Sequence, residues 1–399
     1  MAEAVLTLQP ANGNRRSPVW RLAALCALAM VSACQSVIPK GAGVEQAPPP
    51  PVVVKPVGDL PEDQQRHRIA LLVPITGADA GVGQAIANAA NLAVLDTGGK
   101  AIRVTTYDTA PGAAAAAQKA LADGNKLILG PLLAGDVTAI APIARRAGVP
   151  LLSFSNDASV AGEGTYVLGF TPAQSIERVV AFARTRGVDS FAALIPNGVY
   201  GRRTSTVFLR AVETAGGRVV SLQNYDRSSA SMNAAVARLQ KAGGYDALMI
   251  ADSGSVAITL APLVRARGGA TARILGTELW NTEARVLGAP ALRGAWFASV
   301  SDGLYSQFSA KYRARYAKAP YRLSSLGYDA VLLVVRVARD WKVGSAFPAR
   351  ALADSGGFGG VDGAFRFGKD NVAERMLEVQ QIDAGKLTIL SPAPKAFAK

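Results

Sequence analysis

The stretch RIALLVPITGADAGVGQAIANAANLA, residues 68–93, decides the fold class. Its first nine residues form an almost uninterrupted apolar run, which is typical of a strand buried on both faces of a parallel sheet. A glycine-rich turn follows, and residues 84–96 then have the pattern of a helix. A buried strand that leads through a tight turn into a helix is the first half of a strand–helix–strand unit, so the sequence predicts an α/β protein.

The same alternation of strand and helix continues along the chain at short spacing, which predicts parallel sheets covered by helices on both faces. The first series reaches about residue 176, and a second series of the same design starts there. We therefore predict two doubly wound, Rossmann-like lobes. The strand-like runs are IRVTTYDT (102–109), KLILGPL (126–132) and VPLLSFSN (149–156) in the first series, and SFAALIP (190–196), RVVSLQNYD (218–226), DALMIAD (246–252) and ARILGTEL (272–279) in the second.

The N-terminal segment has the features of an export signal. The apolar run Leu22–Ala33 follows several arginines and is only twelve residues long, whereas a bilayer-spanning helix needs about 20. It ends in Val31-Ser32-Ala33-Cys34, which resembles the bacterial lipobox. This resemblance implies a signal peptide over residues 1–33 and a lipid on Cys34; an ordinary secretory signal with a chance cysteine is the alternative. Gln35 stands where lipoproteins retained at the inner membrane tend to have Asp, which favours the outer membrane.

Residues 34–66 are rich in proline, including Pro48 to Pro51, and have almost no apolar periodicity. This composition predicts a semi-extended linker between the lipid-bearing cysteine and the folded part. Since an extended proline-rich segment spans about 3.1 Å per residue, the folded part would search well away from the membrane. The other cysteine, Cys26, lies in the predicted signal peptide, so the processed chain would contain neither a disulfide nor a free thiol.

The composition argues against several classes of function. The formal net charge is +14, but the basic residues are scattered and not interleaved with aromatic residues, so no nucleic-acid partner is predicted. The single histidine, His67, excludes a His-rich metal site and the usual Ser-His-Asp triad. No pair of carboxylates has a spacing that argues for glycosidase chemistry. We predict a protein that is not an enzyme and that uses no cofactor and no metal.

Longer stretches resemble a known family. LILGPLLAGDVTAIAPIARRAGVPLLSFSND (127–157) and IPNGVYGRRTSTVFLRAVETAGGRVV (195–220) are, like the opening stretch, similar to type I periplasmic binding proteins of the leucine-binding-like branch. ILGTELWNTEARVLGAPALRGAWFA (274–298) and FSAKYRARYAKAPYRLSSLGYDAVLL (308–333) most resemble exported lipoproteins known as penicillin-binding protein activators. The resemblance covers about residues 67–390 and implies two lobes joined by three crossings, with a cleft between them.

On this resemblance, the first lobe would comprise residues 67–176 and about 300–345. The second lobe would comprise residues 177–299 and about 346–399, with the C-terminal part as a hairpin-like end. Open parallel sheets bind ligands at the carboxyl ends of their strands, so we expect any ligand to lie between the lobes.

Polar side chains at these strand ends form a candidate ligand cleft. The resemblance implies that the residues after one strand supply hydroxyls and backbone N–H groups for a substrate carboxylate, and that Glu278 pairs with an ammonium group. Ala134 departs from the pattern, since amino-acid binders often have a serine there. The alternatives are strand-end polar residues without a specific ligand and, for Trp280, packing at the hinge. The candidates are Ser153, Ser155, Asn156, Asp157, Tyr200, Ser253, Glu278 and Trp280.

Gly77, Gly81 and Gly83, between the first strand and helix, invite comparison with phosphate-binding loops. A dinucleotide fingerprint that starts at Gly81 needs glycine or alanine where Ile86 stands, and no Walker lysine follows. We interpret these glycines as a tight turn into a helix.

Two functions are consistent with these observations. The first is an outer-membrane-anchored periplasmic lipoprotein that regulates peptidoglycan synthesis by activating a penicillin-binding protein. The second is a solute-binding lipoprotein that delivers leucine or another amino-acid-type ligand to an ABC importer. The expected partner is accordingly a peptidoglycan synthase or a small molecule in the cleft, and the membrane would be contacted through the lipid.

Overall fold

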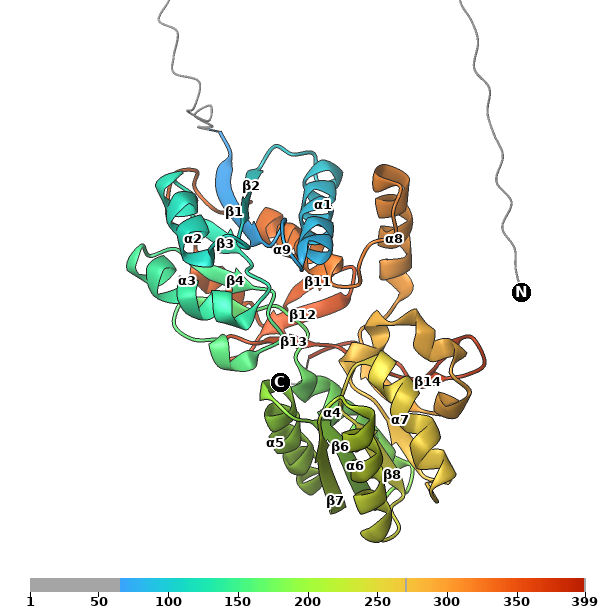
Figure 1. Ribbon diagram of the computed structural model, residues 1–399. Coiled ribbons are helices and arrows are strands. Elements are labelled where there is room, and N and C mark those ends of the chain that lie inside the picture. The colour runs from blue at the N-terminus through green and yellow to red at the C-terminus, as the bar shows by residue number, and fades with distance from the viewer. Residues whose placement is uncertain (1–64, 270, 398–399) are drawn as a thin grey trace, which may run out of the picture. The chain divides into compact units, whose positions relative to one another are not determined.

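The computed structural model describes residues 65–269 and 271–397. The predicted signal peptide, Cys34 and nearly all of the predicted linker lie outside the described residues. Within the described part, helices cover both faces of two mainly parallel sheets (Figure 1). The predicted α/β fold class with two doubly wound lobes is therefore confirmed.

The first sheet is parallel throughout, with the elements β1 (His67–Val73), α1 (Ala80–Asp96), β2 (Ile102–Asp108), α2 (Ala113–Ala122), β3 (Leu127–Leu129), α3 (Ala134–Arg146), β4 (Leu151–Ser153), the 3₁₀ helix η1 (Ala158–Val160) and β5 (Thr165–Val167). Its strand order is β2-β1-β3-β4-β5. Two helices from later in the chain, α8 (Gly303–Tyr316) and α9 (Ser324–Val337), join this lobe.

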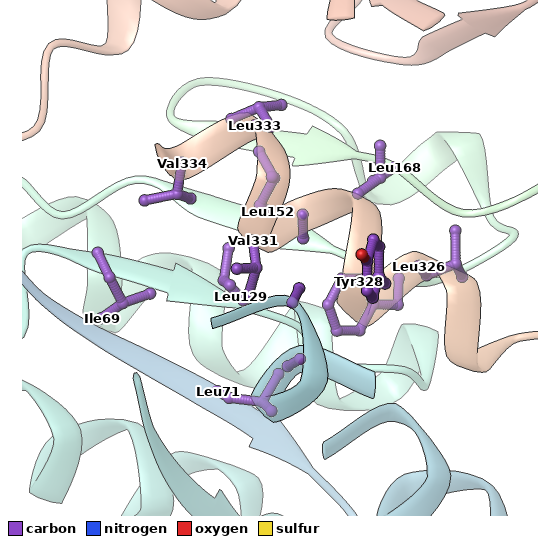
Figure 2. Packing of buried hydrophobic residues seen from close by; sticks show 14 of the residues in the cluster. Ile69, Leu71, Leu129, Leu152, Leu168, Leu326, Tyr328, Val331, Leu333 and Val334 are labelled. Carbon is purple, nitrogen blue, oxygen red and sulfur yellow. The ribbon is translucent and has the colours of Figure 1, made fainter. Parts of the chain in front are cut away.

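Successive side chains of a strand point to opposite faces, so β1 supplies two separate cores. Ile69 and Leu71 pack with α1 and α9, whereas Ala70 and Leu72 pack with α2 and α3. Figure 2 shows the first of these cores, in which side chains of α9 gather with Leu71 and with Leu129 of β3. Because α9 is buried along most of its length, its sequence is apolar from Leu326 to Val335 except at Asp329.

The second sheet is built by α4 (Pro172–Thr185), β6 (Ser190–Pro196), α5 (Val199–Thr214), β7 (Arg218–Tyr225), α6 (Ser229–Lys241), β8 (Ala247–Ile250), α7 (Gly254–Ala266), β9 (Arg273–Leu275), the 3₁₀ helices η2 (Glu278–Thr282), η3 (Ala284–Gly288) and η4 (Pro290–Leu292), and β10 (Trp296–Ser299), with β14 (Glu378–Ile382) and β15 (Leu387–Ser391) added from the C-terminal part. The strand order is β15-β14-β10-β9-β8-β6-β7. The strands from β6 to β10 pair in parallel, and β14 and β15 form an antiparallel hairpin at the edge. Helices α4 and α5 pack on one face, and α6 and α7 on the other.

The segment between α9 and β14 belongs to the first lobe. It contains the 3₁₀ helix η5 (Ala349–Ala353) and a small antiparallel sheet of β11 (Phe358–Gly360), β12 (Gly363–Phe367) and β13 (Ala373–Arg375). Phe358, Phe365 and Phe367 lie in the same buried cluster as α9. The expectation that the second lobe resumes at residue 346 is therefore wrong, because these aromatic side chains are buried against the first lobe. The chain reaches the second sheet only between Arg375 and Glu378.

Candidate functional site

The candidates of the first lobe lie where β4 ends. Ser153 is fully buried, and its Oγ accepts a hydrogen bond from the Ser155 backbone N–H (3.0 Å) and donates one to the Pro131 carbonyl (3.2 Å). The Ser155 Oγ accepts a hydrogen bond from the Asp157 backbone N–H (3.1 Å), and Asn156 is exposed. Both serine hydroxyls thus stabilise the loop that follows β4 through hydrogen bonds with backbone groups.

Asp157 links the two lobes. Its carboxylate accepts hydrogen bonds from the backbone N–H (2.9 Å) and the hydroxyl (2.8 Å) of Ser159, and it forms an ion pair with Arg203 of α5. Arg203 also donates to the Ser159 Oγ at 2.8 Å. The Asp157 side chain is 8% exposed, so this ion pair is shielded from water on the side of the first lobe. The same side chains border a groove of about 550 Å³ between α3 and residues 157–165.

Tyr200 and Glu278 meet on the second lobe. The Tyr200 hydroxyl, in the first turn of α5, lies 3.2 Å from the Glu278 Oε1 and 3.3 Å from the Thr277 Oγ1. Glu278 begins η2, and burial raises the pKa of its carboxyl group to about 8, because the charged form loses its hydration there. The group is therefore mostly protonated at neutral pH. In this state it is a hydrogen-bonding partner of Tyr200 and does not carry the charge that an ammonium group needs.

A buried carboxylate with several hydrogen-bond donors, Asp252, lies at this edge and was not among the predicted site residues. Its buried side chain accepts hydrogen bonds from the Tyr225 hydroxyl (2.8 Å) and from two N–H groups of Arg227 (2.7 and 3.1 Å). The next residue, Ser253, caps α7, since its Oγ accepts a hydrogen bond from the Val256 backbone N–H (3.4 Å). Asp252 is the last residue of the predicted strand 246–252, and Arg227 directly follows the predicted strand 218–226. This position at a strand end was the signal that could have identified them.

Trp280 lies in the core of the second lobe and does not line the cleft. Its side chain is 1% exposed and packs against Phe297, with the ring centroids 6.1 Å apart. Its indole N–H donates to the Asp252 backbone carbonyl (3.0 Å). The assignment of Trp280 as a ligand contact is thus corrected in favour of packing, because a buried indole presents no surface to a ligand.

A second cavity lies at the hinge, where the chain passes between the lobes. Its volume is about 20 Å³, which is room for roughly one water molecule. Two charged residues that line it, Arg322 and Arg375, were not among the predicted site residues. They are 53 residues apart in sequence, and no motif or spacing connects them. The side chains that line it include Phe170, Gln174, Glu278, Val300, Arg322 and Arg375.

Within residues 65–269 and 271–397, no group of three or more His, Cys, Asp or Glu side chains is placed to hold a metal ion. His67, the first residue of β1, stacks on Trp341 with ring centroids 3.7 Å apart. None of the described helices combines the length and apolar character that a membrane crossing requires.

Residues 67–386 match the family model described as periplasmic binding protein. The chain belongs to the periplasmic binding protein family. Membership of this family implies a periplasmic location, and the related structures named below are described as binding or transport proteins. A curated relative, an uncharacterized protein of Rickettsia prowazekii, is 30% identical over 148 residues, which cover 37% of this chain and 40% of that protein.

Solved structures with the same fold include solute-binding proteins of transporters. A leucine binding protein from Thermotoga maritima is 20% identical with a TM-score of 0.65, over 82% of this chain and 99% of that chain. A putative branched-chain amino acid ABC transporter protein from Rhodospirillum rubrum is 22% identical with a TM-score of 0.72, over 82% and 100%. A solute binding protein from R. palustris in complex with benzoate is 20% identical with a TM-score of 0.63, over 83% and 97%. These likenesses confirm the predicted leucine-binding-like fold of this periplasmic binding protein.

Proposed function

We propose that this periplasmic binding protein is an outer-membrane-anchored lipoprotein that regulates peptidoglycan synthesis by activating a penicillin-binding protein. The observation that carries the proposal is that the candidate cleft residues are engaged with one another: Asp157 with Arg203, and Glu278 with Tyr200. A receptor for an amino acid needs polar side chains that are free to pair with the ammonium and carboxylate groups of the ligand. Burying either charge of the ligand without a partner would cost several kcal/mol. A cleft whose polar side chains already pair with one another suits a protein that acts through its surface on another protein.

The choice of partner is supported by the sequence resemblance of residues 274–298 and 308–333 to penicillin-binding protein activators. These stretches form η2 to β10 in the second lobe and α8 to α9 in the first. The predicted lipid on Cys34 and the proline-rich linker would place both lobes within reach of a synthase that works in the periplasm.

A reconstituted synthesis assay tests this function. The purified protein is added to each bifunctional penicillin-binding protein of the same bacterium with a lipid-linked precursor, and the rates of glycan polymerisation and peptide crosslinking are measured. We expect one synthase to bind the protein directly and to work faster in its presence, with heat-denatured protein as the control. Absence of both binding and stimulation for every synthase would reject the proposal.

The anchor is tested separately by mass spectrometry and membrane fractionation. We expect the native protein to begin at a lipid-modified Cys34 and to sediment with the outer membrane. Cys34→Ser should accumulate unprocessed and lose the lipid, whereas Cys26→Ser, within the predicted signal peptide, should be processed normally. An acyl-free N-terminus on the native protein would contradict the anchor.

The second candidate is a solute-binding lipoprotein that delivers an amino-acid-type ligand to an ABC importer. It is favoured by the related structures, which are described as a leucine binding protein, a putative branched-chain amino acid ABC transporter and a solute binding protein in complex with benzoate. It is also favoured by Glu278, whose Oε2 is buried without a hydrogen-bond partner in the described part of the chain. A thermal-shift titration with leucine and isoleucine decides it, because a ligand at 100 times its Kd adds about 2.7 kcal/mol to the free energy of unfolding. A shift that Glu278→Gln abolishes would establish this candidate.

A further inference from the structure

Helices α1 and α8 lie side by side on the first lobe (Figure 1). The Asn88 side-chain amide donates a hydrogen bond to the Tyr312 hydroxyl (3.2 Å), and the Tyr316 hydroxyl donates one to the Asn88 backbone carbonyl (2.9 Å). The Lys311 Nζ lies 2.9 Å from the carboxylate of Asp96, the last residue of α1. The outward sides of the two helices therefore form one continuous surface.

Tyr321 extends this surface to the other end of α1. A Cβ on Gly81, in the first turn of α1, would lie 2.8 Å from the Tyr321 hydroxyl oxygen, so the glycine leaves room for the end of the ring. Tyr321 is nevertheless 55% exposed. We call this region the α1–α8 surface, and its exposed side chains are those of Gln84, Asn91, Leu95, Arg315, Lys318 and Tyr321.

The part of this surface that α1 contributes carries no charge. Residues 80–95 contain no Asp, Glu, Lys or Arg, although Gln84 and Asn91 are exposed and Leu95 is 56% exposed. Charged residues are depleted at the centre of protein–protein interfaces, because a charge that is buried there loses its hydration. The outward side of α1 therefore has the composition of an interface centre.

The part that α8 and the following segment contribute is positively charged. Residues 303–328 include several Lys and Arg but neither Asp nor Glu. Burial raises the pKa of the Tyr316 hydroxyl, and the neighbouring Arg315 guanidinium opposes this shift, which places Arg315 next to α1. Lys311 and Arg315 are four residues apart, a spacing at which like charges destabilise a helix. Since no carboxylate in the described ranges forms an ion pair with Arg315 or Lys318, both remain available to a negatively charged partner.

Leu95 and Tyr321 lie at opposite ends of the α1–α8 surface. The part of α1 from Gly81 to Leu95 is about 21 Å long, at a rise of about 1.5 Å per residue. This length fits within a protein–protein interface of standard size, which covers about 800 Å² of each partner. Tyrosine and arginine are enriched among the residues that dominate binding energy, and an exposed aromatic or aliphatic side chain at each end can fill a pocket on a partner.

We propose that the α1–α8 surface binds an acidic surface of the peptidoglycan synthase. This inference rests on the proposed function and adds the surface through which the protein contacts its partner. A guanidinium fork pairs with an Asp or Glu carboxylate through two parallel hydrogen bonds, which suits Arg315. The amides of Gln84 and Asn91 find donors and acceptors on another protein but none in the hydrocarbon of a membrane. The observations therefore favour a protein partner.

Binding of the purified protein to the synthase that it stimulates, measured by surface plasmon resonance, tests this surface. The double variant Arg315→Glu/Lys318→Glu reverses two charges on it, and the control Arg202→Glu/Arg210→Glu reverses two charges at exposed positions of α5 on the second lobe. We expect the first variant to bind at least about tenfold more weakly and to stimulate correspondingly less, and the control to behave as the wild type. Added salt should weaken the binding of the wild type more than that of the first variant, because salt screens charges.

A second pair of variants tests the surface without a change of charge. Leu95→Ser removes an exposed apolar side chain from α1, and Leu209→Ser removes one from α5, where Leu209 is 46% exposed. Because both side chains are about half exposed, both variants should unfold at temperatures close to that of the wild type. Only Leu95→Ser should weaken synthase binding, by at least about fivefold. If the charge-reversal variant does not fold, this pair decides.

The outcomes separate this surface from the proposed function. If the wild type neither binds nor stimulates any synthase, the proposed function is rejected, and the partner named here with it. If the wild type binds and stimulates, but Arg315→Glu/Lys318→Glu and Leu95→Ser do so equally well, only the role of the α1–α8 surface is overturned. Sedimentation with phosphatidylglycerol vesicles or with purified peptidoglycan that these variants lose, while they still bind the synthase, would also overturn the proposal and assign the surface to the membrane or the cell wall.

Discussion

Glu278 combines burial with incomplete hydrogen bonding. Its Oε1 contacts the Tyr200 hydroxyl, whose pKa is also raised by burial, while its Oε2 has no partner among the described residues. A neutral carboxyl group is tolerated in such a place, whereas its ionisation would put an uncompensated charge into the protein interior. The proton on Glu278 is therefore linked to the stability of the fold.

We predict that Glu278→Gln removes part of the pH dependence of stability. The folded protein holds this proton up to about pH 8, whereas an ordinary glutamate releases it near 4.5. Between these values the folded state binds more protons than the unfolded state, so the free energy of unfolding falls as pH rises, by up to about 1.4 kcal/mol per pH unit from this group. Urea denaturation across this pH window should show that the stability of the variant relative to the wild type increases as pH rises.

The matched control is Glu163→Gln, since the Glu163 side chain is 84% exposed. If the curves of Glu278→Gln and the wild type run parallel, Glu278 is not a buried neutral acid.

Among the helices, the contact between α1 and α9 depends on a glycine. A Cβ on Gly327 would lie 2.5 Å from the Ile86 backbone oxygen, which cannot move away without disturbing α1. We predict that Gly327→Ala lowers the free energy of unfolding by about 1–3 kcal/mol, as other overpacked cores do. Gly303→Ala, at the first residue of α8, is the control, because its Cβ would meet nothing closer than 3.8 Å. Chemical denaturation measures both variants, and equal midpoints would contradict the close packing of α1 and α9.

The small sheet β11-β12-β13 is predicted to stabilise the first lobe. Phe365 of β12 is fully buried between Phe358 and Phe367, with ring centroids 5.7 and 6.2 Å away. Phe365→Ala should lower the free energy of unfolding by about 3–5 kcal/mol, because it removes a large side chain from a filled core. Ile389→Ala on β15, where the side chain is 53% exposed, should change it by less than about 1 kcal/mol. If Phe365→Ala lowers the free energy of unfolding no more than Ile389→Ala does, residues 349–375 are not part of the core of the first lobe.

These elements also mark how far the sequence could predict the structure. Continuous apolar runs identified β1 and β6, because both strands are buried on both faces of their sheets. The short strands β5 and β10 were not among the predicted runs. The third crossing was misplaced in the prediction. The aromatic residues of β11 and β12 indicate in the sequence that this segment is buried, but only the fold shows that it is buried against α9. The hinge arginines were missed for the same reason, as the residues around the cavity come from distant parts of the chain. Asp329, a lone carboxylate inside the apolar run of α9, was the local signal that a buried polar cluster exists.

Taken together, the lobes are joined at two levels. At the hinge, Gln174 and Arg375 connect the crossing segments through backbone groups. At the cleft, Asp157 and Arg203 connect side chains of the first lobe and α5. We expect the hinge contacts to persist when the angle between the lobes changes, because they lie within the crossings themselves. The ion pair forms only when the lobes are close, so it selects the closed arrangement.

We therefore predict that Arg203→Gln shifts the protein toward an open arrangement. The variant leaves the Asp157 carboxylate buried without its cation, which costs about 1–3 kcal/mol and is relieved when the lobes separate and water reaches it. Hydrogen–deuterium exchange should become faster in residues 153–160 and 199–204, which face each other across the cleft, and should stay unchanged in β1 and β6. Arg202→Gln is the matched control, since it removes the same charge from the neighbouring exposed position. Identical exchange in the two variants would mean that the ion pair does not hold the lobes together.

If the protein acts on a synthase in its closed form, Arg203→Gln should also reduce the stimulation of synthesis, whereas Arg202→Gln should not.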